Sequence, residues 1–294
     1  MGIFKKLFGK KNEKEKVVLE REDQPDVHYI ADEDDRMNWA MEKARLTLHY
    51  FKSSIAAPRE DQLYFSVKAK IEENGIIEHI WLGEPSYDDD GNIYGVVGNE
   101  PADISNVSLG QKIGVAENEV SDWMIIENAR LIGGYTIRAI RDGLSEEELP
   151  EFDQSLGMII DEGEDHFPVD FNTPEGAILS IEEAYNENNL SKALICKNFR
   201  KEAEFMLGNM TNLPMDDEIL DKTAEVIELS FVQHMQENGM PDFNNVKRAF
   251  RREFKSEDHC LVTEYCTFPD GRRTLDKVNT YRENGEWKVL NGES

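Results

Sequence analysis

LGQKIGVAENEVSDWMIIENARLIGGYTIRAIR, residues 109–141, is the most informative stretch of the chain. It joins a Gly-containing turn to a short apolar strand, Lys112–Val115, and then to a second predicted strand, Asp122–Glu127. The adjacent glycines Gly133 and Gly134 follow, and the apolar spacing after them predicts a helix that starts at this point. Short strands and a helix in so few residues predict a small α+β domain.

The residues before this stretch continue the same pattern. Apolar residues at helical spacing predict a helix from Met37 to Phe51, which Pro58 prevents from extending. Alternation then predicts strands at Tyr64–Ile71, Ile76–Leu82 and Ile93–Val97, and Asn74-Gly75 is typical of a hairpin turn. We therefore expect a small antiparallel sheet with flanking helices over residues 36–145.

Several sequence blocks in this region resemble a bacterial YegJ-like family of unknown function. They are FSVKAKI, EHIWLGEP, GNIYGVVGNEP, LGQKIGV, SDWMI and GGYTIRAIR, within residues 37–141. The resemblance implies the fold but no catalytic residue. Because some related families resemble immunity proteins of toxin systems, it also suggests an inhibitor that binds another protein.

The C-terminal part, residues 171–294, places helices before strands. Thr173 is a predicted N-cap with Pro174 at the first helical position, and further helices are expected at Leu190–Phe199 and Ile219–Gln236. Strands are predicted at Ala249–Phe254, His259–Phe268, Arg272–Tyr281 and Trp287–Leu290. This order resembles the cone-shaped α+β fold of nuclear transport factor two, which implies a pocket between helix and curved sheet or a homodimer interface.

Two segments outside these domains are rich in charge. Residues 1–35 predict a disordered leader, whose Ile3–Lys11 part is a short basic amphipathic patch too small for stable membrane anchoring. Residues 146–170 are acidic and interrupted by Pro and Gly, which predicts a linker, although Leu156–Ile160 is apolar enough to dock on one domain. The chain is thus expected to hold two domains.

Composition limits the classes of partner. The 60 acidic and 33 basic side chains give a net charge of -27, which disfavours nucleic acid and favours a basic protein, although acidity also simply confers solubility. The three cysteines show no CxxC spacing, and no secretory leader or apolar run of membrane-spanning length is apparent, so we expect a cytoplasmic protein. Neither a metal nor a cofactor is expected.

Polar residues near the predicted strand ends form the candidate binding site of the first domain. They are Asn99, Glu100, Pro101, Ser121, Asp122, Trp123 and Arg138. Ser121, His79 and Asp122 are the residue types of a catalytic triad. We reject this triad, because the adjacent residues Ser121 and Asp122 should point to opposite faces of a strand. We expect His79 to be a hydrogen-bonded strand histidine, and the Trp81 and Trp123 rings to lie in the core.

In the second domain, His259, Glu264 and Tyr265 are the candidate pocket residues, and at most one of the last two can point inward. A basic cluster, Lys247, Arg248, Arg251 and Arg252, recurs at helical spacing and suits either an acidic partner or a solvated face. Together these features predict a noncatalytic interaction protein. The alternative is a small-molecule binder or enzyme that uses the C-terminal pocket.

Overall fold

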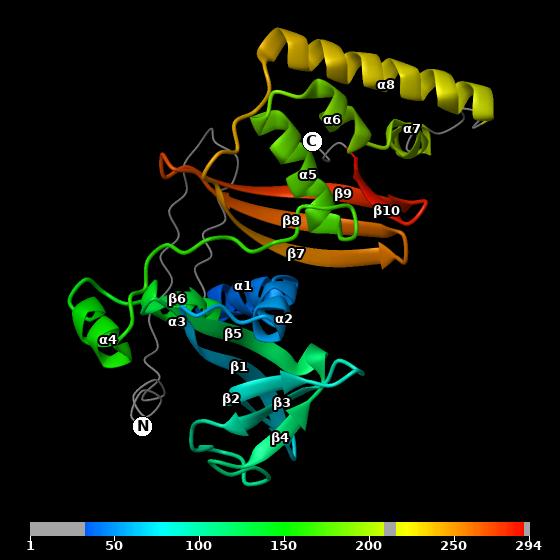
Figure 1. Cartoon of the computed structure of the whole chain (residues 1–294). Helices are drawn as coiled ribbons and strands as arrows, with labels where there is room; N and C mark the ends of the chain where they lie inside the picture. Colours follow the sequence, from blue (N-terminus) through cyan, green and yellow to red (C-terminus); the bar gives the residue numbers. More distant parts are fainter. Residues whose placement is uncertain (1–32, 209–215, 291–294) are drawn as a thin grey trace. The chain divides into compact units, whose positions relative to one another are not determined.

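The computed structural model describes residues 33–208 and 216–290, and it divides the chain into two compact units, Met1–His166 and Phe167–Ser294 (Figure 1). Both units combine helices with an antiparallel sheet, so the α+β class is confirmed. The predicted leader lies outside the described residues, except that its last three residues begin the first helix. None of the described helices is long and apolar enough to cross a membrane.

The first unit is built on a six-stranded antiparallel sheet with the strand order β4-β3-β2-β1-β5-β6 (Figure 1). The strands are β1 (Gln62–Glu73), β2 (Ile76–Tyr87), β3 (Ile93–Val97), β4 (Lys112–Val115), β5 (Val120–Glu127) and β6 (Arg130–Gly133). A short 3-10 helix, η2 (Glu117–Glu119), precedes β5. The predicted β1–β2 hairpin is confirmed, because Asn74 and Gly75 adopt φ values of 54° and 83° at its turn.

Helices α1 (Glu33–Leu46) and α2 (Leu48–Ala56) pack on one face of this sheet. The predicted single helix is interrupted at Thr47, whose hydroxyl donates to the Lys43 carbonyl at 2.7 Å. Ala44 and Phe51 are completely buried against alternate strand residues such as Val67. This apolar layer is the main core of the unit.

Helices α3 (Tyr135–Arg141) and α4 (Leu149–Leu156) contribute to a smaller core, which contains Trp81, Met124 and Leu156. Here the predicted linker needs correction. Much of it belongs to the first unit, because it forms α4, buries Leu156 and pairs the backbone of Ile159 with Arg130. The predicted docking of Leu156–Ile160 is confirmed.

The second unit contains a four-stranded antiparallel sheet with the order β10-β9-β8-β7 (Figure 1). Its elements are α5 (Pro174–Asn186), α6 (Leu190–Ile195), α7 (Phe199–Gly208), α8 (Asp217–Asn238), β7 (Lys247–Ser256), β8 (His259–Thr267), β9 (Arg273–Glu283) and β10 (Glu286–Val289). Helix α5 starts as predicted, because the Thr173 hydroxyl accepts the Gly176 N–H at 3.1 Å. Strand β6 and helices α4 and α7 were not predicted.

Aromatic side chains of the two edge strands meet on one face of the second unit's sheet. Phe254 lies on β7 and Trp287 on β10, at the two ends of the strand order, yet their ring centroids are 6.0 Å apart. The axes of these two strands would be about 14 Å apart in a regular flat sheet, so the two rings reach across the strands between them. The side chains of the edge strands therefore meet across one end of the inner face.

The basic cluster of the second unit is arranged differently from the prediction. All four of its residues lie on strand β7 rather than on a helix, so alternate side chains point to opposite faces. Arg248 and Arg252 share the inner face with buried Phe250, whereas Lys247 and Arg251 point the other way. The cluster is not one continuous basic surface.

Candidate functional site

Asp122 is the most completely buried acidic side chain of the first unit, with no exposed surface. Its carboxylate accepts hydrogen bonds from the amides of Trp123 (2.8 Å), Tyr135 (3.1 Å) and Thr136 (2.8 Å), and from the Thr136 hydroxyl (2.6 Å). Burial raises the pKa of Asp122, while these donors and the charge of Lys68 oppose the shift. The carboxylate ties β5 to the start of α3.

Lys68 lies opposite Asp122 on β1 and is only 5 % exposed. Its Nζ donates to the Thr136 hydroxyl at 3.3 Å and lies 5.6 Å from the centroid of the Trp81 ring. Burial lowers the pKa of Lys68, and the nearby carboxylate opposes that shift. Lysine, hydroxyl and carboxylate thus form a buried polar chain that supports the fold.

A β-bulge changes our expectation for Ser121. The β1–β5 register shifts between Lys68 and Ala69, and the Ser121 hydroxyl lies 2.9 Å from Nδ1 of His79. We expected Ser121 and Asp122 to point to opposite faces on the assumption of regular alternation, which the bulge at Ser121 interrupts. A catalytic triad still does not form, because the Asp122 carboxylate is directed at α3 and Ser121 is fully buried.

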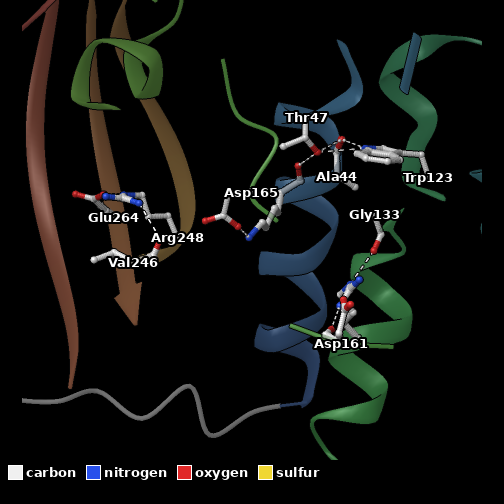
Figure 2. Close-up of polar contacts among 11 residues, drawn as sticks. Ala44, Thr47, Trp123, Gly133, Asp161, Asp165, Val246, Arg248 and Glu264 are labelled. Carbon is white, nitrogen blue, oxygen red and sulfur yellow. Dashed lines mark hydrogen bonds and ion pairs between the residues drawn. The ribbon is translucent and has the colours of Figure 1, made fainter. Parts of the chain in front are cut away.

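The expected structural roles of His79, Trp81 and Trp123 are confirmed. His79 is hydrogen-bonded, and burial lowers its pKa to about 4, so the ring is neutral at pH 7. Trp81 is 1 % exposed and Trp123 is fully buried. The Trp123 indole donates to the Ala44 carbonyl at 3.0 Å, as Figure 2 shows. A Cβ on Gly133 would lie 2.5 Å from this indole, which explains the glycine there.

The other predicted rim residues do not form one exposed site. Asn99 is 8 % exposed and accepts the Trp81 amide at 2.9 Å. Glu100 is exposed and Pro101 is half-buried on the loop after β3. Ser121–Trp123 lie within β5 rather than on a loop. The structure therefore does not gather these side chains around a cavity.

Arg138 and Arg141 hold the chain that follows α3. Arg138 donates to the backbone carbonyls of Gly133 (2.9 Å), Leu131 (2.6 Å) and Asp161, and Figure 2 labels Gly133 and Asp161. Arg141 forms a bidentate pair with Asp153 of α4 at 2.8 and 2.9 Å. Arg138, predicted as a binding residue, is thus engaged in contacts within the unit.

The segment fastened in this way, residues 142–166, is called the acidic segment below. It contains no Lys or Arg but ten acidic residues: Asp142, Glu146, Glu147, Glu148, Glu151, Asp153, Asp161, Glu162, Glu164 and Asp165. Besides Asp153, Asp161 pairs with Arg130 and Asp165 with Lys43. Glu146, Glu147 and Glu151 remain exposed on and before α4. The first unit therefore displays a fixed anionic surface.

The second unit has a buried charged cluster between α5 and the sheet. Arg248 Nη2 lies 2.6 Å from Glu182, and its Nε lies 3.5 Å from Glu264 (Figure 2 shows the latter pair). Burial raises the pKa of Glu182 to about 9, with Glu264 adding to the shift and Arg248 opposing it. Ligand atoms of Glu182, Glu264 and Cys266 lie within 4.8 Å of one another, a spacing that could suit a metal ion. The guanidinium already supplies the positive charge there, so the cluster fits a metal poorly.

The predicted pocket residues of the second unit lie on different faces. Glu264 points inward into this charged cluster, which confirms that Glu264 and Tyr265 cannot both do so. His259 is on the other face, where its Nε2 lies 2.8 Å from Asn279 Oδ1 and its ring contacts Phe205. These three side chains do not line a common cavity.

A pocket of about 480 Å³ lies instead at the end of the inner face where Phe254 meets Trp287. Its lining residues are Asn172, Thr173, Pro174, Arg252, Phe254, Ser256, Glu257, Arg282 and Trp287. Its volume is within the range of small-molecule sites. We did not predict it, because the lining comes from three strands and a helix start. The only sequence signal was the alternation of Arg252 and Phe254 on one face of β7.

Comparison with known proteins shows what the first unit is similar to. Residues 34–160 match a bacterial family. Its description is "Uncharacterized protein conserved in bacteria (DUF2314)". The Escherichia coli K12 protein "Uncharacterized protein YegJ" is 35 % identical over 98 residues, which cover 33 % of this chain and 63 % of that protein. The YegJ-like resemblance is therefore confirmed.

A second relative is a Neisseria meningitidis serogroup B protein named as an ankyrin repeat protein. It is 32 % identical over 180 residues, which cover 58 % of this chain and 66 % of that protein. The chain thus spans just under two thirds of the length of both relatives. No solved structure matches the chain significantly.

Proposed function

We propose that the chain is a noncatalytic bacterial binding protein that recognises a basic protein through its first unit. In its most concrete form, the chain is an immunity-like inhibitor that covers a basic toxin or effector in the cytoplasm. The second unit, with a cone-like sheet, assists by binding a small ligand or by dimerising.

The acidic segment carries this proposal. A disordered acidic linker could adapt to many partners, but this segment is held on the first unit by Arg138, Arg141 and the buried Leu156. Its exposed carboxylates are therefore pre-organised, which reduces the entropy lost on binding. Opposite charge also accelerates encounter and weakens with salt.

The side chains that could act in catalysis are engaged in internal contacts, which supports the proposal that the protein is not an enzyme. Asp122, Ser121 and His79 each have hydrogen-bond partners inside the first unit, and none of them lines the pocket described above. Glu182 and Glu264 share Arg248 within the second unit. Their shifted pKa values have a structural explanation in burial.

Affinity purification of the tagged full chain from its native host tests the proposal. We expect a stoichiometric basic protein to be retained at low salt and to be weakened at moderate salt. In a variant with Glu146, Glu147 and Glu151 changed to Gln, retention should fall sharply.

The matched control changes three exposed carboxylates on α8, Glu225, Glu228 and Glu237, to Gln. It alters the net charge equally but leaves the acidic segment intact, so retention should persist. Equal loss in both variants would mean that total charge, not this surface, attracts the partner. Absence of any retained protein at either salt concentration would refute the proposal.

The pocket of the second unit favours a second candidate, a small-molecule binder. Its volume and mixed lining of arginine and aromatic side chains support this candidate. Dimerisation through the same unit is the remaining role, and the mass of the purified chain in solution tests it directly.

A further inference from the structure

The pocket of the second unit has two arginines in its lining, although the chain as a whole is acidic. Arg252 and Arg282 both line it, against one acidic lining residue, Glu257. Their side chains are 29 % and 33 % exposed, so both guanidinium groups are partly open to solvent. A ligand that carries a negative charge would therefore find two guanidinium groups in one cavity.

Neighbouring acids position these arginines. Arg252 Nη1 lies 4.0 Å from Glu175, a carboxylate that is 1 % exposed, and Arg282 Nε lies 3.0 Å from Asp258. Glu257 lies 3.4 Å from Arg282 and its side chain is 90 % exposed. Since a highly exposed ion pair contributes little to stability, a ligand carboxylate could displace Glu257 from Arg282 at a low cost in free energy.

The start of α5 contributes little to anion binding, although it borders the pocket. Its first residue, Pro174, has no N–H, and the Gly176 N–H already donates to the Thr173 hydroxyl. The buried Glu175 carboxylate adds negative charge to this first turn. The arginines are therefore the groups that select the charge of a ligand.

The other side of the pocket is flat and apolar. Phe254 is 54 % exposed and meets Trp287 edge to face. Each ring also has an arginine near it, with Arg252 at 5.8 Å from the Phe254 centroid and Arg282 at 5.7 Å from the Trp287 centroid. Covering the exposed Phe254 ring would remove apolar surface from water.

From this geometry we infer that the pocket binds a small organic carboxylate with a flat apolar group. The carboxylate lies between Arg252 and Arg282, and the flat group packs on Phe254 and Trp287. This inference rests on the second candidate function above and specifies the ligand class.

Isothermal titration of the full chain with benzoate, benzamide and inorganic phosphate tests the inference. Benzoate should bind at one site, and benzamide, which has the ring but no charge, at least about tenfold more weakly. Arg282→Gln should weaken benzoate binding about tenfold or more, because a charge-assisted hydrogen bond is lost. Phe254→Ala should weaken it about three- to tenfold.

Arg272 provides a matched control outside the pocket. It also lies over an aromatic ring, Phe268 at 4.0 Å, and beside an acid, Asp270 at 3.9 Å, but it does not line the cavity. Arg272→Gln should leave benzoate affinity within about twofold of the wild type. An equal effect of Arg272→Gln and Arg282→Gln would overturn the assignment.

The probes separate the possible failures. Equal binding of benzamide and benzoate would keep a small-molecule pocket but refute the selection of an anion. Tighter binding of phosphate than of benzoate would refute the role of the flat apolar wall. If no probe binds, the ligand class is wrong, while partner binding through the acidic segment stands or falls on its own purification experiment.

Discussion

Replacing Asp122 with Ala should strongly destabilise the first unit. Asp122 is fully buried, and its carboxylate accepts four hydrogen bonds that link β5 to α3. Alanine would leave the amides of Tyr135 and Thr136 without this acceptor and would leave the buried Lys68 without the nearby opposite charge. Breaking one partner of a buried charged network costs about 3–5 kcal/mol of unfolding free energy.

Tryptophan fluorescence can follow this unit alone. The chain has four tryptophans, of which Trp287 is in the second unit and Trp39, Trp81 and Trp123 are buried in the first. In a Trp287→Phe background, urea unfolding monitored by fluorescence therefore reports the first unit. The expected result is a lower midpoint for Asp122→Ala with a similar dependence on urea.

Asp88→Ala is the matched control, because Asp88 also accepts four hydrogen bonds, from Asp90, Asn92 and Tyr94, but at a solvated turn. Asp88→Ala should lower the unfolding free energy clearly less than Asp122→Ala does. The double variant with Lys68→Met and Asp122→Ala should lose less than the two single losses combined, because no buried amine is then left. A loss of less than about 1 kcal/mol for Asp122→Ala would refute the structural role assigned to this carboxylate.

Three further predictions concern protonation and packing. The pKa of His79 is lowered to about 4 by burial, against about 6.5 when unfolded, so the stability of the first unit should fall as the pH drops from about 6.5 towards 4. The fall should be shallower for His79→Gln in urea titrations at each pH, and identical curves would contradict the assignment. Gly133→Ala should cost several kcal/mol because its Cβ would overlap a buried ring, whereas Gly75→Ala, also at positive φ but with open space, should cost about 1 kcal/mol in thermal unfolding. Arg248→Met should cost about 3–5 kcal/mol, because it leaves Glu182 buried without the charge that opposes its raised pKa of about 9. The cost should be similar at pH 5 and pH 8, where Glu182 stays protonated with or without Arg248, and should grow as the pH rises above about 9. Circular dichroism at pH 8 and at about pH 10 measures this, and an equal loss at both values would argue against it.

Local patterns predicted the strands better than they predicted the sites. The β1–β2 hairpin follows from alternating apolar residues and an Asn-Gly turn, and α5 follows from Thr173 and Pro174. These signals involve residues close together in the chain, so no tertiary contact is needed to read them. The same approach missed α4 because its eight residues, among acids, resemble a linker in composition.

The candidate sites depended on contacts that sequence spacing does not contain. The Ser121 hydroxyl lies beside the His79 ring at a β-bulge that shifts the strand register. The Arg138 guanidinium donates to backbone carbonyls within the unit. The pocket combines Arg252 and Phe254 of β7 with Trp287 of β10, which are the two edge strands of the sheet. A contact between edge strands depends on the arrangement of the whole sheet rather than on any one strand.

The sequence by itself determined the α+β class, the acidic charge and most of the strands, because periodicity and composition act locally. Tertiary structure decided which charged groups are available. It engages Asp122 and Arg138 in internal hydrogen bonds, holds the acidic segment on the first unit and places Arg252 and Arg282 in the lining of one pocket. Burial and pairing set the chemistry of a side chain, and both depend on residues that lie far away in the sequence.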